Sequence, residues 1–252
     1  MLRIDYVARM EADRPEFWPG SIPWQSDEGS VGSYPGADGY GSSIQRLRIA
    51  RPNLPQWWAE AIASYAVWPV VTVGPRDTEG LAEWLVAQGY ELMERQDLMV
   101  QDNNLLWEQG YQADVQEVDT AQDLHTVSQL DNLVFQDPVL REEDLARELA
   151  RLKGTGRHQF FIAGGDDVAR AAAGMTTFSG WGLLWGGQTH PRHRNQGLYR
   201  ALVLHRLWWA HQENLDFVGV YANQRTSQPI LAHLGFQTVE SVDIYRRPAS
   251  SG

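Results

Sequence analysis

Residues 181 to 199 join three features in a fixed order: an apolar run, a cationic loop and the start of a helix-like segment. The apolar run Trp181–Thr189 has the character of a strand. The basic or partly basic side chains that follow it are Arg192, His193 and Arg194. Gly197 then precedes a helix-like segment over 198–213. The first N–H groups of a helix have no partner within it, the helix dipole attracts negative charge, and glycine lets the backbone approach a ligand. The segment therefore predicts a strand, loop and helix that bind a pyrophosphate.

Composition restricts the classes of protein to which this chain can belong. Its 252 residues include 21 Lys and Arg against 32 Asp and Glu, a formal net charge of −11 that disfavours nonspecific nucleic-acid binding. The absence of cysteine excludes thiolate nucleophiles and cysteine–zinc sites, and the histidines show no metal-ligand spacing, so we predict no metal. No apolar run could span a bilayer and no secretion signal begins the chain, which predicts a cytoplasmic protein without a membrane partner.

The order of the predicted elements indicates a mixed sheet flanked by helices. A Pro-, Gly- and Ser-rich stretch at 15–55 is expected to be an excursion outside the core, and a strand, helix and strand follow up to residue 100. The polar segment 102–111 predicts a linker between a domain over 1–105 and a domain over 110–248. In the second domain we expect strands at 114–118, 158–163, 168–178, 181–189, 216–222 and a pair within 237–246, with helices at 120–135, 139–153, 198–213 and 227–234. This order predicts an α/β or α+β fold.

Part of the sequence recurs at a constant offset of 146 residues. The paired positions include Gly89 and Gly235, Glu94 and Glu240, and Asp97 and Asp243. Two unrelated units that share a glycine stop are the alternative, because glycine commonly ends helices. We favour a diverged repeat whose N-terminal copy has kept its strand–helix–hairpin end and lost the anion-binding loop.

The loop at 194–199 resembles motif A of the GNAT superfamily of acyl-CoA N-acyltransferases. That motif reads Arg or Gln, two residues, Gly, one residue, and then Gly or Ala. Arg194 and Gly197 match it, whereas Tyr199 stands where the second small residue usually lies.

A second stretch resembles the end of motif B of the same superfamily. It runs from Asn223 through Ser227 to Leu234-Gly235-Phe236. The order of elements over 114–246 is also similar to the family fold. The resemblance implies a GNAT-like mixed sheet over 110–248 and, with the recurrence at 146 residues, a tandem GNAT whose N-terminal domain is diverged and noncatalytic.

The resemblance also implies a site for acetyl-CoA. Backbone groups at the end of the 181–189 strand would contact the pantetheine arm and the acyl carbonyl, and a backbone N–H there would stabilise the oxyanion. The Gly186-Gly187 pair fits a bulge or a splay at that point. The loop would hold the pyrophosphate, and Asn223 would line the other side of the pantetheine channel. The implied cofactor-binding residues are Gly187, Gln188, Thr189, Arg194, Asn195, Gln196, Gly197, Leu198, Tyr199 and Asn223.

The sequence departs from the family at the positions of the general acid and the general base. Many members carry a tyrosine five residues before the Phe of Leu-Gly-Phe, and here that position is Leu231. The 181–189 strand also lacks the carboxylate that many members use as a base. Tyr221 and Ser227 are the substitute catalytic candidates, although each also fits a structural role, for Ser227 that of a helix cap. Direct attack by a neutral amine, with positioning supplying most of the rate, is the mechanism that we expect.

Together these patterns predict an N-acetyltransferase that moves an acetyl group from acetyl-CoA to a primary amine. A noncatalytic acyl-CoA-binding or sensing protein with the same fold is the alternative, because the tyrosine and the carboxylate are missing. The acceptor stays open between small-molecule and peptide amines, since a fold does not fix a substrate. A pseudo-dimeric monomer and a homodimer are both compatible with a tandem arrangement.

Overall fold

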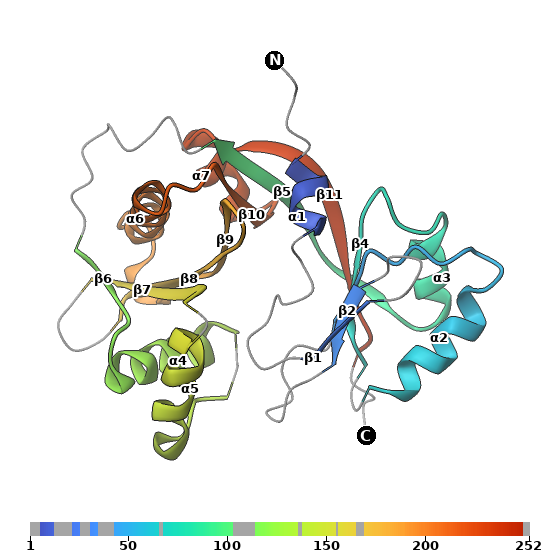
Figure 1. Cartoon of the computed structure of the whole chain (residues 1–252), viewed down its shortest axis with the longest axis horizontal. Helices are drawn as coiled ribbons and strands as arrows, with labels where there is room; N and C mark the ends of the chain where they lie inside the picture. The colour runs from blue at the N-terminus through green and yellow to red at the C-terminus, as the bar shows by residue number, and fades with distance from the viewer. Residues whose placement is uncertain are drawn as a thin grey trace. The chain divides into compact units, whose positions relative to one another are not determined.

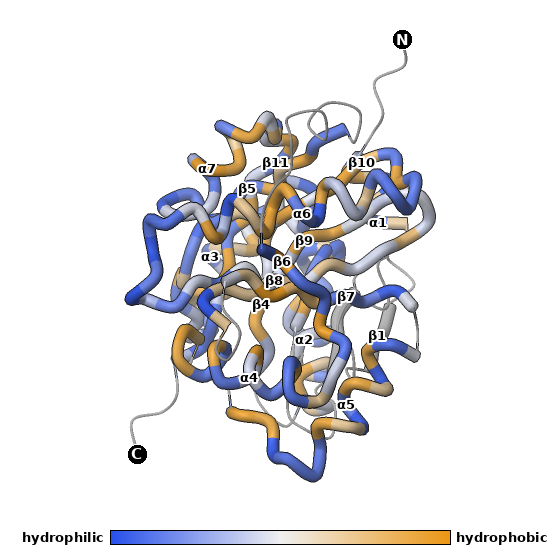
Figure 2. Tube along the Cα trace, turned by 90° about the vertical axis from the view of Figure 1, so that its left-hand side faces the viewer, coloured by the Kyte–Doolittle hydropathy of each residue, from blue (hydrophilic) through white to orange (hydrophobic). Residues whose placement is uncertain are grey.

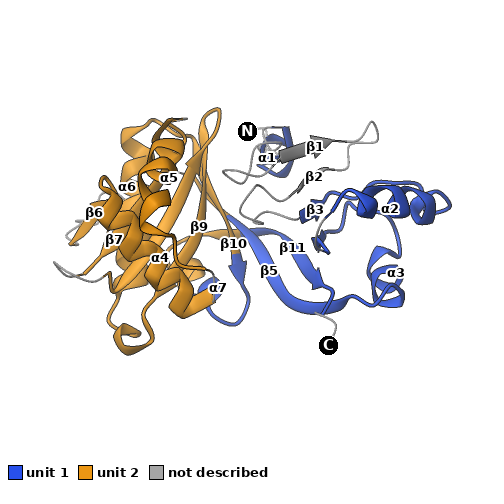
Figure 3. Cartoon of the chain, turned by 90° about the horizontal axis from the view of Figure 1, so that it is seen from below, with its two compact units in different colours: residues 1–99, 222–229, 238–252 blue, residues 100–221, 230–237 orange. Residues whose placement is uncertain are grey.

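The computed structural model describes residues 6–12, 22–25, 31–34, 43–65, 68–102, 114–135, 138–154, 156–164 and 169–248. The chain forms two compact units, coloured separately in Figure 3. Unit 1 comprises residues 1–99, 222–229 and 238–252, and unit 2 comprises residues 100–221 and 230–237. The predicted linker at 102–111 lies outside the described residues except for Asp102, and the division into domains over 1–105 and 110–248 stays a prediction.

Unit 2 is a mixed sheet with helices on both faces. Its strands, in sheet order, are β10 (Phe217–Asn223), β9 (Trp181–Thr189), β8 (Ala171–Thr177), β7 (His158–Ala163) and β6 (Val115–Glu117). Neighbouring strands run antiparallel except β9 and β10, which are parallel. Helices α4 (Ala121–Phe135) and α5 (Glu142–Gly154) cover one face and α6 (Leu198–Gln212) the other (Figure 1).

The core of unit 2 follows from the helix periodicity of the sequence. Along α5, hydrophobic and hydrophilic stretches alternate (Figure 2), as expected for a helix with one buried face. Leu145 and Leu152 are its buried residues, and they join Leu124 and Val127 of α4 in a cluster against the sheet. This packing anchors α4 and α5 beside the strands that carry the predicted site.

Unit 1 contains a sheet that draws strands from both ends of the chain. Its elements are α1 (Tyr6–Ala12), β1 (Ile22–Gln25), β2 (Val31–Tyr34), β3 (Ser43–Gln45), α2 (Leu54–Ala63), β4 (Val70–Val73), α3 (Leu81–Ala87), most of β5 (Glu91–Asp102) and most of β11 (Gln237–Arg246). β3 runs parallel to β4, and β11 pairs antiparallel with β4, Asp243 lying opposite Val73. The strand pair that we expected within 237–246 is therefore a single strand.

The expectation that residues 15–55 lie outside the core is wrong for residues 43–55. Ile44, Leu47 and Leu54 are fully buried in the core of unit 1. The apolar residues of this segment alternate with arginines, such as Arg46 and Arg48, which is the pattern of a half-buried strand. The preceding Pro and Gly residues obscured that pattern.

The predicted repeat has the same helix in both copies. α3 and α7 (Ser227–His233) begin and end 146 residues apart. Each is followed by a glycine with positive φ, Gly89 at 84° and Gly235 at 91°. In both copies the N–H one residue later donates to a carbonyl of the helix, Tyr90 to Leu85 at 3.0 Å and Phe236 to Leu231 at 3.1 Å. A shared helix length and a shared cap are what a diverged repeat would have, and the repeat stays a prediction because glycine caps are common.

α3 begins at Leu81 with Gly80 at its N-cap, so Asp77, three residues earlier, does not cap this helix. The Asp77 carboxylate instead accepts the N–H of Gly74 at 2.7 Å. Burial raises the pKa of Asp77 to about 6; Glu240 and Glu11 also raise this pKa, whereas the Gly74 hydrogen bond and Arg48 lower it. The folded unit therefore binds this proton more tightly than the unfolded chain does.

Stability should fall as the pH rises through the range in which Asp77 titrates. Between about pH 4 and pH 6 the folded state holds a proton that the unfolded state has lost, so ionising Asp77 costs about 1–3 kcal/mol of unfolding free energy. Asp77→Asn keeps an acceptor for Gly74 without the charge. Urea unfolding of both proteins at pH 4 and pH 7 should show the wild type losing stability relative to the variant. A difference that does not change with pH would contradict this assignment.

Candidate cofactor-binding site

The predicted bulge lies at Gly186 and Gly187 of β9. Gly174 of β8 is opposite Trp185 and Ala172 is opposite Gln188, so the two glycines share a single partner residue. Gly186 has a φ of 58°, which glycine adopts without the strain that a side chain would cause. The bulge therefore turns main-chain groups of β9 out of the regular ladder.

The pairing of β9 with β10 ends just before this bulge, and we call the region beyond it the splay. The parallel register of these strands runs from Trp181 opposite Phe217 to Leu184 opposite Val220. Both strands continue beyond that last pair, β9 to Thr189 and β10 to Asn223. The pairing of the two strands therefore ends before β9 does, which is the geometry in which an extended ligand can lie along β9.

The loop after β9 has the geometry of an anion cradle. A short 3₁₀ turn, Pro191–His193, begins at His190, whose ring nitrogen accepts the N–H of Arg192 at 3.1 Å. Gly197 has a φ of 79° and stands at the N-cap of α6, where a Cβ would meet no atom within 4 Å. Within the described part of the chain, the main-chain N–H groups of residues 194–197 donate to no acceptor. These donors lie beside the helix N-terminus, which favours negative charge.

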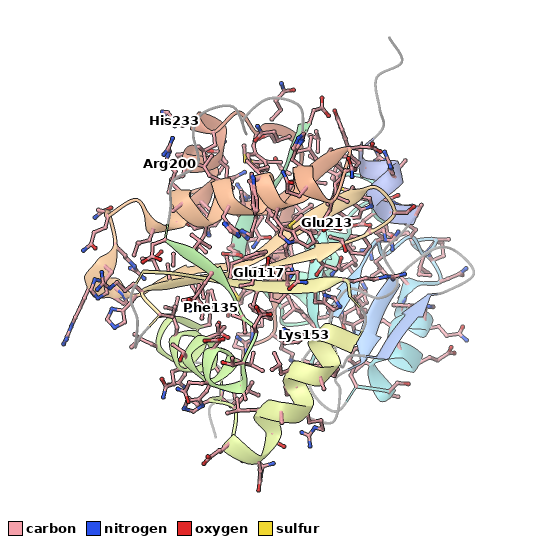
Figure 4. The ribbon with its side chains drawn as sticks, turned by 60° about the vertical axis from the view of Figure 1, so that its left-hand side comes forward. Glu117, Phe135, Lys153, Arg200, Glu213 and His233 are labelled. Carbon is pink, nitrogen blue, oxygen red and sulfur yellow. The ribbon has the colours of Figure 1, made fainter. Side chains whose placement is uncertain are left out.

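Exposed arginine side chains lie in this loop and at the start of α6. The side chains of Arg192 and Arg194 are exposed and form no ion pair with any described residue. Arg200, on the first turn of α6, is also exposed (Figure 4). The first helical hydrogen bond of α6 runs from the N–H of Ala201 to Gly197 at 2.9 Å, so the amides of residues 198–200 precede it. The loop and the helix start thus fit a pyrophosphate by charge and by donors.

Tyr199 is brought against the bulge. A Cβ at position 187 would lie 2.7 Å from its ring, so the tyrosine packs directly on Gly187. The departure from the family pattern at position 199 therefore places an aromatic ring between the start of α6 and the end of β9.

The other predicted residues have contacts of their own. Gln188 is 3% exposed, and its side chain donates to the Asp131 carboxylate of α4. Tyr221 is half-buried, one residue beyond the last β9–β10 pair. Asn223 and Ser227 belong to unit 1, where the Asn223 amide donates to Glu94 at 2.7 Å. The sequence suggested Ser227 as the N-cap of a helix. In the structure Ser227 is instead the first helical residue of α7.

Two residues contact β9 although the sequence analysis did not single them out. Asp131 supplies a carboxylate from a helix 57 residues upstream of Gln188. Arg206 is 1% exposed on α6, and its guanidinium donates to the carbonyls of Leu202 at 3.0 Å and Gly174 at 2.9 Å. The only sequence signal for Arg206 is a basic residue among the apolar positions of a helix.

Arg206 remains a cation in spite of its burial. Burial lowers its pKa to about 10, and the Tyr199 phenol acts in the opposite direction. Burial and the Arg206 charge lower the pKa of the neighbouring His205 to about 4, so that His205 is neutral at pH 7. Arg206 forms no ion pair with any carboxylate in the described ranges.

Two further features are absent from the described residues. No group of three or more His, Asp or Glu side chains in that part of the chain could hold a metal ion. None of its helices is both long enough and apolar enough to cross a bilayer.

Comparisons with known proteins identify the fold. Neither a family model nor a curated protein sequence matches this chain. The structure is similar to a GCN5-related N-acetyltransferase from Kribbella flavida, with a TM-score of 0.70 and 15% identity, covering 98% of each chain. It is similar to a GCN5-related N-acetyltransferase from Sphaerobacter thermophilus, with a TM-score of 0.56 and 14% identity over 88% of this chain and 82% of the other.

A tandem protein is among the similar structures. It is described as a tandem GNAT protein from the clavulanic acid biosynthesis pathway, with a TM-score of 0.55 and 15% identity over 90% of this chain and 83% of that one. The prediction of a GNAT-like fold, with a mixed sheet flanked by helices, is confirmed.

Proposed function

We propose that this protein transfers an acetyl group from acetyl-CoA to a primary amine and that unit 2 holds the acyl-CoA. The observation that carries the proposal is the combination of the bulge at Gly186-Gly187, the splay beyond Leu184 and the open N–H groups of residues 194–197. Each fits one part of the same ligand. A noncatalytic role for the diverged N-terminal copy is part of the proposal.

Different residues of unit 2 would bind different parts of acetyl-CoA. The N–H groups of residues 194–198, with the Arg194 side chain, would hold the pyrophosphate, and the main chain of residues 187–189 would pair with the amides of the pantetheine arm. A bulge N–H would donate to the thioester carbonyl and stabilise the charge that develops there. Tyr221, beside the splay, is the candidate donor of a proton to the leaving thiolate. Holding both reactants in this geometry would supply much of the rate.

Asp131 is a carboxylate that lies close to the end of β9. It lies on α4, on the face of the sheet opposite α6, and its bond to Gln188 places it near the end of β9. Phe135, one helical turn further along α4 and therefore on a similar face, is 49% exposed (Figure 4). We propose that Asp131 attracts the ammonium group of the acceptor and accepts its proton, and that the apolar end of α4 contacts the acceptor's body.

A CoA-release assay with Asp131→Asn tests the proposed activity. A panel of primary amines is assayed for acceptor-dependent thiol release, and calorimetry measures acetyl-CoA affinity in parallel. We expect release by the wild type, a fall of at least tenfold in the variant, and acetyl-CoA affinity within about twofold, because the asparagine oxygen can still accept the hydrogen bond from Gln188. No binding of acetyl-CoA at millimolar concentration would refute the proposed function.

A noncatalytic acyl-CoA sensor is the second candidate. It is favoured by Leu231, which is fully buried at the position where many family members carry a tyrosine. A sensor would bind acetyl-CoA in the calorimeter and release no CoA with any amine of the panel. Any acceptor-dependent release above hydrolysis excludes it.

A further inference from the structure

The peptide that joins Trp185 to Gly186 is held from both faces of the sheet. On the face of α6, one nitrogen of the buried Arg206 guanidinium lies 2.9 Å from the carbonyl oxygen of Gly174 and 3.5 Å from that of Trp185. These two residues are opposite each other immediately before the bulge. A cation at this point draws both carbonyl oxygens toward α6.

On the other face the indole of Trp185 is fixed. Its N–H donates to the Thr176 hydroxyl at 2.8 Å, and its ring meets Phe160 edge to face at 4.7 Å. A Cβ at position 174 would lie 2.6 Å from the indole, so the ring covers Gly174 closely. Trp185 therefore cannot turn without breaking packing on one side and hydrogen bonds on the other.

The geometry points to Arg206 as the positioning residue that aims the main-chain N–H of Gly186 at the thioester carbonyl. This inference rests on the proposed function. It adds which amide donates to the thioester carbonyl and which side chain orients that amide. In a trans peptide the C=O and the N–H point in opposite directions. Phe178 donates to Trp181, and hydrogen-bonded pairs alternate along an antiparallel ladder, so the Gly174–Trp185 pair directs the Trp185 oxygen at β8. The N–H of Gly186 therefore points away from β8, toward β10, and the guanidinium of Arg206 holds the Trp185 oxygen in that orientation.

A buried cation is suited to this role for two reasons. The guanidinium is planar and always charged, so it can hold two carbonyls in one orientation. It forms no ion pair with a described carboxylate, so its positive charge also acts on the oxyanion that forms when the amine attacks the thioester carbon. No bond to Arg206 forms or breaks, and the electron pair that reaches the carbonyl oxygen returns when the thiolate leaves.

The carbonyl stretching frequency of bound acetyl-CoA, labelled with ¹³C at the carbonyl, tests this inference by infrared difference spectroscopy. In the wild type a hydrogen bond from Gly186 should lower the frequency below that of free acetyl-CoA. Arg206→Met keeps an unbranched side chain without donors, and at least half of the shift should be lost while the affinity for CoA stays within about threefold. Arg206→Lys, with one cationic donor group, should keep an intermediate shift. Arg147→Met, on an exposed arginine of α5, is the matched control and should keep the whole shift.

A measurement on the wild type needs no variant to fold. With ¹⁵N-glycine labelling, the amide signal of Gly186 should differ between the CoA and acetyl-CoA complexes, and that of Gly187 should differ less. A full carbonyl shift in Arg206→Met, or a response confined to Gly187, would overturn the inference while leaving the proposed function standing. Failure of the wild type to bind acetyl-CoA would remove both.

Discussion

Gly197→Asp should weaken acetyl-CoA binding by about 10- to 100-fold. The new carboxylate would project at the N-cap of α6, within reach of the pyrophosphate, and two like charges about 5 Å apart at a protein surface repel by about 1–3 kcal/mol. Space alone would not exclude it, since a Cβ at this position meets no atom within 4 Å. Calorimetric titration with acetyl-CoA at low ionic strength measures the effect, and added salt should reduce it.

Gly197→Asn is the matched control for that experiment. Asn has nearly the same shape as Asp and tolerates the left-handed conformation that Gly197 adopts, with a φ of 79°. Any cost of placing a side chain there is shared by both variants, so the ratio of their affinities isolates the charge. Equal affinities would move the pyrophosphate away from this loop.

Trp181→Ala should destabilise unit 2 by about 3–5 kcal/mol. Trp181 is completely buried at the start of β9, and its ring is stacked against Phe178 at 4.2 Å and Phe217 at 5.7 Å. Removing it leaves a cavity between β9 and β10 at the first pair of their parallel register. Chemical denaturation, followed by a probe in unit 2, should show the loss as a lower transition midpoint with a similar slope.

Trp208→Ala is the matched control for Trp181→Ala. It removes the same side chain from a partly exposed position, so it separates the effect of burial from that of losing an indole. Trp208 is on α6 in the same unit and is 37% exposed, so we expect its removal to cost about 1 kcal/mol or less. Similar losses for the two variants would contradict the role of the Trp181 stack in holding the strands together ahead of the splay.

The features that the sequence predicted well are those encoded in neighbouring residues. Two consecutive glycines in an apolar strand indicate a bulge, and the bulge lies at Gly186 and Gly187. Gly197 before an apolar periodic run indicates a helix start, and α6 begins at Leu198. Such signals depend on the local conformational preferences of a few residues, so a single sequence is enough to read them.

The features that it did not predict depend on contacts between distant residues. Asp131 reaches Gln188 across 57 residues, and Arg206 reaches Gly174 across 32. Only the packing of α4 and α6 on opposite faces of the sheet determines which helical side chains lie against β9 (Figure 1). A carboxylate supplied by a helix leaves no signal in the sequence of the strand that it contacts.

The pairing of β11 with β4 has a consequence for the order in which the protein can fold during synthesis. Tyr245 and Asp243 lie opposite Val71 and Val73, so β4 is synthesised long before the strand that pairs with it. Until that strand is made, β4 presents an unpaired edge, which is a template for pairing with other chains. Unit 1 thus depends on β11 for its completion, and nascent or truncated chains that lack this strand should aggregate through that edge.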